Sequence, residues 1–238
     1  MVMRADNDFL YIIPARGGSK GIPHKNIKAL HGKPLIYYSI DIARSLASDD
    51  HICVSTDDEE IIKVVSDYGL HVPFVRPKIL ANDTASTNDV LLHALQYYES
   101  IGRTYRAIVL LQPTSPLRLV ENVMGAIQLY SEDIDMVVSV KSSAAAAVIC
   151  EEDTDGFLTM TLNKEDARRQ DVKQYYEYNG AVYVINPKSL KEKGLSHFSR
   201  IKKSIMDDIH SIDIDTPFDW LIAETILEKS LLNGLNQL

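Results

Sequence analysis

Short apolar runs alternate along the chain with longer segments in which apolar residues recur every three or four positions. The short runs are β-prone and typical of buried strands, and they occupy residues 9–13, 51–55, 72–75, 107–111, 136–140 and 180–185. The longer segments predict amphipathic helices and occupy residues 33–47, 56–68, 88–100, 120–130 and 216–229. Strands and helices in this rhythm predict an α/β fold with a mostly parallel sheet and helices on both faces.

Residues that start and stop helices agree with these boundaries. Pro34 suits a first helical turn, and Thr56 opens a capping box. Gly69 is typical of a helix end. Thr216 and Pro217 are typical of the start of the last helix. The result is a Rossmann-like arrangement, in which polar loops that follow parallel strands meet at one edge of the sheet.

The alternation breaks between residues 141 and 178. This segment is polar, contains an Asp155-Gly156 pair that suggests a hairpin turn, and becomes basic at Arg168 and Arg169. We therefore expect one domain over residues 1–238, with residues 141–178 as a small lobe inserted into it.

Composition narrows the class of protein. A chain of 238 residues with 45% apolar content can bury one sizeable core, and a net charge of −8 argues against nucleic acid as its partner. Cys53 and Cys150 have no disulfide or zinc spacing, which favours reduced thiols in the cytoplasm. Residues 1–8 lack the apolar region of a signal peptide, and no apolar run approaches the roughly 20 residues that span a bilayer. We expect a cytoplasmic protein without a membrane partner.

A cationic glycine loop follows the first predicted strand. Glycine lets successive backbone N–H groups turn toward one anion, and Arg and Lys suit phosphate oxygens. The spacing matches neither the P-loop nor the dinucleotide fingerprint. We interpret the loop as a triphosphate cradle; the alternative is a tight turn with solvated charges. Its glycines and cations are Arg16, Gly17, Gly18, Lys20, Gly21 and Lys25.

Residues 211–215 alternate apolar and acidic positions and predict another strand. Asp213 and Asp215 would then project from the same face, and two carboxylates so close require a neighbouring cation. Mg²⁺ held by these carboxylates and by substrate phosphates meets that need. The alternative is a solvated strand face ahead of the last helix.

The glycine loop resembles the N-terminal signature of the acylneuraminate cytidylyltransferases, the CMP-sialic acid synthetases. The family pattern Ala-Arg-x-x-Ser-Lys-Gly-x-x-x-Lys-Asn reads here as residues 15–21 followed by Lys25 and Asn26. The resemblance implies that this loop grips the phosphates and cytosine of CTP. The residues it assigns to the nucleotide or to catalysis are Ala15, Arg16, Gly17, Gly18, Ser19, Lys20, Lys25 and Asn26.

Later segments resemble the same family in the same order. Arg76-Pro77 and the stretch 82–86 imply that Arg76, Asp83 and Ser86 lie near cytosine and ribose. The loop 112–116 implies a sugar contact for Gln112, whereas we expect Arg118 to be a solvated residue at a helix start. Arg-Arg-Gln-Asp at 168–171 and Asn-Gly at 179–180 add Arg169 and Asn179 as sugar contacts, and Asp213 with Asp215 resembles the metal-binding pair.

The resemblance implies a nucleotidyltransferase that moves CMP from CTP to the anomeric hydroxyl of a sialic-acid-like nonulosonate, with Asp215 and Mg²⁺ in the catalytic site. It also implies a homodimer in which the lobe reaches over the partner's site. Departures from the pattern at Glu177 and residues 144–148 indicate that the sugar acid differs from N-acetylneuraminate. Two alternatives remain: a cytidylyltransferase for another sugar acid such as the Kdo octulosonate, and a CTP-binding module without turnover.

Overall fold

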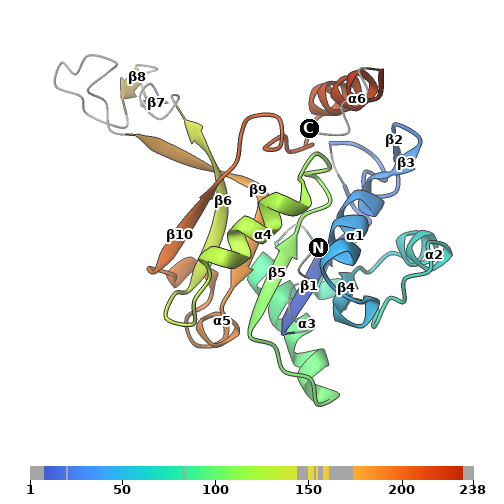
Figure 1. Cartoon of the computed structure of the whole chain (residues 1–238), viewed down its shortest axis with the longest axis vertical. Coiled ribbons are helices and arrows are strands. Elements are labelled where there is room, and N and C mark those ends of the chain that lie inside the picture. Colours follow the sequence, from blue (N-terminus) through green and yellow to red (C-terminus); the bar gives the residue numbers. More distant parts are fainter. Residues whose placement is uncertain are drawn as a thin grey trace.

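The computed structural model describes residues 8–19, 21–82, 84–143, 150–152, 154, 158–160 and 174–232, with the backbone alone for 150–152, 158–160 and 230–232. The strands are β1 Phe9–Pro14, β2 Ala29–Leu30, β3 Lys33–Pro34, β4 Ile52–Ser55, β5 Ala107–Leu111, β6 Met136–Ser143, β7 Cys150–Glu152, β8 Leu158–Met160, β9 Tyr175–Ile185 and β10 Ile201–Ile205 (Figure 1). The helices are α1 Leu35–Leu46, α2 Glu59–Asp67, α3 Thr87–Ser100, α4 Val120–Leu129, α5 Pro187–Lys193 and α6 Pro217–Leu232.

Six strands form one sheet in the order β10-β6-β9-β5-β1-β4. β1 pairs in parallel with β4 and β5, and β10 pairs in parallel with β6. Only β9 runs antiparallel to its neighbours β5 and β6. The predicted mostly parallel α/β sheet is therefore confirmed, with one reversed strand inside it.

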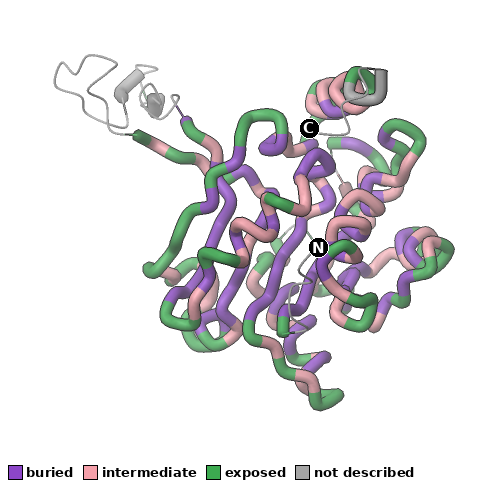
Figure 2. The backbone as a smooth tube through the Cα atoms, in the orientation of Figure 1, coloured by how far each residue is buried: buried purple, intermediate pink, exposed green. Residues whose placement is uncertain are grey.

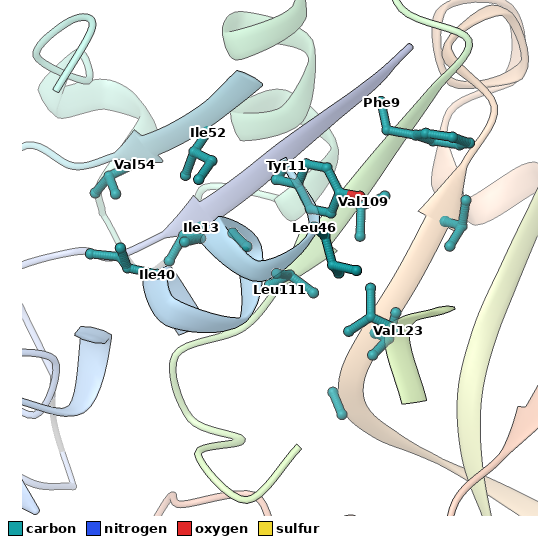
Figure 3. Close-up of a cluster of buried hydrophobic side chains, with 14 of the residues drawn as sticks. Phe9, Tyr11, Ile13, Ile40, Leu46, Ile52, Val54, Val109, Leu111 and Val123 are labelled. Carbon is teal, nitrogen blue, oxygen red and sulfur yellow. The ribbon is translucent and has the colours of Figure 1, made fainter. Parts of the chain in front are cut away.

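Helices cover both faces of this sheet because its central strands are apolar on both sides. Tyr11 and Ile13 of β1 pack in a cluster with side chains of α1, α2 and α4, and Figure 3 shows part of that cluster around Ile40 and Leu46. Leu10 and Ile12 point to the other face and pack with α3 and α5. The buried trace of β1 and β5 runs through the middle of the molecule in Figure 2, as expected for a sheet covered on both faces.

The last helix, α6, packs away from the sheet, over the glycine loop. Trp220 and Ala223 of α6 form a third buried cluster with Ile22, Leu30, Leu35 and Ile214. The predicted start of α6 is confirmed, since Thr216 and Asp219 cap its first turn with reciprocal side-chain to backbone hydrogen bonds. This helix therefore fixes the segment that carries the acid pair.

Two predicted strands are wrong. Residues 72–75 contribute only an isolated bridge from Val75 to Thr56, and residues 211–215 form no strand. Ile214 is nonetheless fully buried and Asp215 is exposed, because the segment is held by the third cluster. Pro34 is the residue before α1 and belongs to a short β2–β3 hairpin, so the helix begins at Leu35, two residues later than the predicted start at residue 33.

Strands β6 and β9 overlap the two ends of the segment 141–178, which the sequence predicts to be an inserted lobe. β6 and β9 pair out to Ser143 and Tyr175, with a shift of register between Val138 and Val140, and residues 144–174 lie between the two strands. Within that span β7 and β8 form an antiparallel pair, as a hairpin would, but the predicted turn at Asp155 and Gly156 lies outside the described residues. In the described part of the chain, no helix is long and apolar enough to cross a membrane.

Candidate active site

A cleft of about 520 Å³ opens where β1 and β5 end. It is lined by the glycine loop after β1, by the loop after β5 and by the segment that carries Asp213 and Asp215. The residues drawn from the sequence predictions that line it are Arg16, Ser19, Lys25, Asn26, Arg76, Gln112, Asp213 and Asp215. The structure therefore brings the predicted phosphate loop and the predicted acid pair to one cavity.

The glycine loop is shaped by close approaches that exclude a side chain. A Cβ atom on Gly17 would collide with the Asp58 carboxylate, and one on Gly21 would collide with the backbone carbonyl of Asp215. Asn26 is buried, and its Nδ2 donates to the Arg16 carbonyl over 3.0 Å, which closes the loop on itself. These contacts explain glycine at positions 17 and 21 without reference to any ligand.

Lys25 joins the loop to the acid pair. Its Nζ donates to the Ile214 carbonyl over 2.6 Å and to Asp215 Oδ1 over 3.0 Å. The Lys25 side chain is only 12% exposed, whereas that of Asp215 is 74% exposed. One cation is thus held in the cleft by a fixed carbonyl, next to a carboxylate that remains open to solvent.

Asp213 lies deeper in the cleft. Its Oδ1 is buried without a hydrogen-bond partner among the described residues. Its Oδ2 lies against Gly180, and a Cβ atom added to Gly180 would lie 3.3 Å from that oxygen. Burial raises the pKa of this carboxyl above its ordinary value, the neighbouring Thr114 hydroxyl opposes that rise, and the negative charge of Asp215 adds to it. An unpaired buried carboxylate oxygen is a hard donor that a cation would satisfy.

The acid pair fits a magnesium ion that also takes oxygen ligands from a substrate. No group of three His, Cys, Asp or Glu side chains suited to a metal is found within the described ranges. Mg²⁺ is commonly held by one or two carboxylates together with phosphate oxygens and water. Asp213 and Asp215 would supply the protein share of such a set, while Lys25 partly neutralises Asp215.

Arg76 and Ser86, predicted on the nucleotide side, are tied into the framework. Arg76 is buried, and its guanidinium donates to the Ser55 hydroxyl over 3.0 Å and to the carbonyls of Ser55 and Leu80. Ser86 caps α3, where its hydroxyl accepts from the Asp89 N–H over 3.1 Å. Arg76 lines the cleft; Ser86 does not, although its neighbours Ala85 and Thr87 do.

On the predicted sugar side, Gln112 and Asn179 differ in position. Gln112 lines the cleft. Asn179 is buried outside it, because its Oδ1 accepts from Ser139 over 2.6 Å and its Nδ2 donates to Ser211 over 2.8 Å. The Asn179 amide thus joins β6, β9 and the segment that precedes Asp213. Its remaining surface faces a second hollow of about 270 Å³, which shares Asp213 with the main cleft.

Three predicted site residues, Lys20, Asp83 and Arg169, lie outside the described residues. Their neighbours Ser19, Gly21 and Asn82 line the cleft. Ala15 is buried at the end of β1, and its N–H donates to the Ser55 carbonyl over 2.9 Å. Gly18 is exposed and is not among the lining residues.

Sequence reasoning missed two groups around the cleft. Arg118, interpreted as a solvated residue, is 2% exposed and forms hydrogen bonds with three different elements, so that interpretation was wrong. Asp57 accepts from the Gly17 N–H over 3.4 Å, and Asp58 both caps α2 and packs against Gly17. The signal that could have located these contacts is the pair of adjacent aspartates directly after the second predicted strand.

The fold and the cleft together define an α/β protein suited to a nucleotide. The chain belongs to the cytidylyltransferase family, whose profile matches residues 10–212. It is 34% identical to CMP-N,N'-diacetyllegionaminic acid synthase of Legionella pneumophila, over 92% of this chain and 96% of that protein. It is 33% identical to pseudaminic acid cytidylyltransferase of Campylobacter jejuni, over 91% and 95%. The predicted kinship with nonulosonate-activating cytidylyltransferases is confirmed.

Two further comparisons define the extent of the similarity. N-acylneuraminate cytidylyltransferase of Escherichia coli is 35% identical over 92% of this chain, which spans only 52% of that longer protein. The solved structure of CMP:2-keto-3-deoxy-manno-octonic acid synthetase complexed with CTP superposes with a TM-score of 0.71, covering 94% of this chain and 99% of that one. At 18% identity this likeness establishes a shared fold.

Proposed function

We propose that the protein transfers CMP from CTP to the anomeric hydroxyl of a sialic-acid-like nonulosonate. The sugar oxygen forms a bond to the α-phosphorus while the bond from that phosphorus to the bridging oxygen of pyrophosphate breaks. Pyrophosphate leaves, and the hydroxyl proton passes to solvent. The observation that carries this proposal is that the cationic glycine loop and the acid pair line one cleft.

The chain's own groups supply positioning and charge neutralisation, which dominate phosphoryl-type transfers. Arg16 and Lys25 face the cleft as cations for the triphosphate, and Ser19 adds a hydroxyl donor. Lys20 belongs to the same loop and is proposed to neutralise the leaving phosphates. Because Lys25 is held by the Ile214 carbonyl, its charge is placed before the nucleotide arrives.

Asp213 and Asp215 are proposed to hold Mg²⁺, which would screen the negative charges of the triphosphate. The two carboxylates leave room for phosphate ligands, since Asp215 is largely exposed. Asp213 also lies between the main cleft and the second hollow, so an acceptor sugar that fills the hollow would approach the nucleotide beside it.

The class of acceptor follows from the relatives, whose names specify legionaminic, pseudaminic and N-acylneuraminic acids. All three are nonulosonic acids, and Gln112 and the proposed Arg169 suit hydroxyl and carboxylate groups of such sugars. Glu177 pairs with Lys141 over 2.7 Å at the edge of the second hollow. An acidic side chain at this position, where the sialate pattern has a basic one, supports an acceptor other than N-acetylneuraminate.

A pyrophosphate-release screen tests the proposal. Purified protein, CTP and Mg²⁺ are combined in turn with N-acetylneuraminic, legionaminic, pseudaminic and Kdo acids. Release with a nine-carbon acid and formation of the CMP-sugar are expected, and Asp215→Ala should abolish release while the protein stays folded. Release with Kdo alone would favour the octulosonate alternative. CTP binding without release under any condition would favour the non-catalytic module.

A further inference from the structure

Arg118 lies buried beneath the cleft, at the end of the loop that follows β5. Its Nη1 donates to the carbonyls of Gln112 and Ala181 over 3.2 and 2.6 Å. Its Nη2 donates to the Ser39 hydroxyl over 2.7 Å. One guanidinium therefore joins α1, the end of β5 and β9, and it does so without lining the cleft.

Each of these acceptors supports a group in the cleft. The Gln112 carbonyl also accepts from the Ser39 hydroxyl over 3.2 Å, so two donors fix the backbone of a residue that lines the cleft. Ala181 follows Gly180, against which the Asp213 carboxylate rests. Arg118 thus holds both the loop beneath Gln112 and the strand beneath Asp213.

A backbone hydrogen bond continues this chain of contacts to the acid pair. The Ile214 N–H donates to the Thr114 carbonyl over 2.8 Å, which ties the residue between the two aspartates to the loop that Arg118 closes. We propose that Arg118 is a positioning residue for the acceptor side of the reaction. It holds Gln112 and Asp213 in fixed positions relative to each other and does not contact the substrate. This inference rests on the proposed function for its assignment of Gln112 to the sugar.

The chemistry of the side chain favours arginine at this position. Burial lowers the pKa of Arg118 to about 9, while the negative charge of Asp213 opposes that change. The guanidinium still carries its charge near neutral pH, and a buried charge is tolerated only with hydrogen-bond acceptors around it. A planar fork can donate to three oxygens in fixed directions, which a lysine ammonium on a flexible stem does not reproduce.

Steady-state kinetics with Arg118→Met and Arg118→Lys test the inference. For Arg118→Met we expect the KM for the sugar acid to rise by about tenfold, equivalent to ~1.4 kcal/mol, with the KM for CTP within about twofold of the native value. Arg118→Lys should recover part of the sugar KM. Ser39→Ala is a milder change, which removes one hydrogen-bond acceptor of Arg118. It should shift the sugar KM in the same direction, and it provides the test if Arg118→Met does not fold.

Asp135→Asn is the matched control, because Asp135 is also a buried charged hub but lies at the N-terminal end of β6, at the opposite edge of the sheet. It should lower the melting temperature and leave both KM values unchanged. Equal changes in both KM values for Arg118→Met, or a sugar KM shift in Asp135→Asn, would overturn the positioning role.

Amide hydrogen exchange separates this inference from the proposed function. Exchange at residues 112–117 and 211–215 should speed up in Arg118→Met and not in Asp135→Asn. A native enzyme that turns over none of the sugar acids would refute the proposed function, while the exchange pattern would still decide whether Arg118 orders this loop and the acid pair.

Discussion

At Gly21, which lines the cleft, the backbone lies very close to the backbone of Asp215. A Cβ atom there would overlap the carbonyl oxygen of Asp215, which is backbone and has little freedom to move. Gly18, three positions earlier in the same loop, has no atom within 4 Å of its would-be Cβ. Comparing these two glycines therefore distinguishes a position with no room for a Cβ atom from a position where glycine affects only the flexibility of the loop.

Gly21→Ala should destabilise the protein by about 2 kcal/mol, the usual scale for forcing a methyl group into a packed site. For a chain of this size that corresponds to roughly 4–8 °C in melting temperature. Gly18→Ala should leave the melting temperature close to the native value. Thermal unfolding of the two variants side by side checks this, and equal melting temperatures would show that the loop tolerates a Cβ against Asp215.

At the same scale, the sequence was enough to locate the site residues that belong to short local motifs. Arg16, Lys25, Asp213 and Asp215 belong to compact motifs, and all four line the cleft. Arg118 has no such motif, because its acceptors lie up to 79 positions away and are mostly backbone carbonyls. A carbonyl leaves no mark in the amino-acid sequence, so the burial of this arginine could not be predicted.

At the scale of elements, the periodicity of apolar residues located the central strands and most helices. It failed where contacts between distant parts of the chain determine the secondary structure. The alternation at 211–215 placed Ile214 inside and Asp215 outside, as observed, but the segment has no neighbouring strand to pair with. α5 was missed although Asn186, Pro187 and Gly194 are strong start and stop signals. β10 was missed because four of its five residues are exposed and its pattern is weak.

Asp135 joins three elements, since it precedes β6 and contacts α5 and the segment before β10. Hydrogen bonds from the Lys193 ammonium, the Arg200 N–H and the Ser189 hydroxyl hold the pKa of this carboxyl well below its ordinary value. A carboxyl with a depressed folded-state pKa stabilises the fold above its unfolded pKa, about 3.9, and loses that contribution as the pH falls toward the folded value.

Asp135→Asn should therefore cost about 2 kcal/mol at neutral pH, the scale of a buried hydrogen bond to a charged group. The difference from the native protein should stay constant down to about pH 4 and shrink below it. Urea unfolding of both proteins across this range measures the difference. A gap that is unchanged below about pH 4 would show that the charge of Asp135 does not contribute.

The helix α6 contains the single tryptophan of the chain, so tryptophan fluorescence can report on changes at the cleft. Trp220 is buried in a cluster with Ile22, which follows Gly21, and with Ile214, which lies between the two aspartates. Binding of CTP with Mg²⁺ should change the surroundings of the indole ring and produce a saturable change in its fluorescence. Trp220→Phe should lose the signal, and an unchanged spectrum at saturating CTP would mean that α6 does not respond to the cleft.

At the scale of the whole molecule, the rhythm of the sequence was enough to predict a covered, mostly parallel sheet with its cleft at the strand ends. The reversal of β9 was not predicted, because direction depends on how the chain returns from residues 144–174. The single domain with an inserted lobe, and the homodimer that the lobe would form, stay predictions. The pairing of β6 with β9 makes both testable.

Ser143 and Tyr175 are register partners at the outer ends of β6 and β9, so a two-residue Asn-Gly turn can replace residues 144–174. We expect the native chain of 26.7 kDa to elute at twice its mass and the shortened chain to elute as a monomer in size-exclusion chromatography with light scattering. The shortened chain should bind CTP, because the cleft residues lie outside the replaced segment, and should lose turnover.

Arg169→Ala in the full-length chain separates the two roles proposed for the lobe. It should remain a dimer and raise the KM for the sugar acid more than the KM for CTP, since its proposed contact is the sugar carboxylate. A shortened chain that still dimerises would place the interface elsewhere on the molecule. A shift in the CTP KM alone would remove Arg169 from the sugar, and the lobe would then serve assembly and leave acceptor recognition to residues such as Gln112.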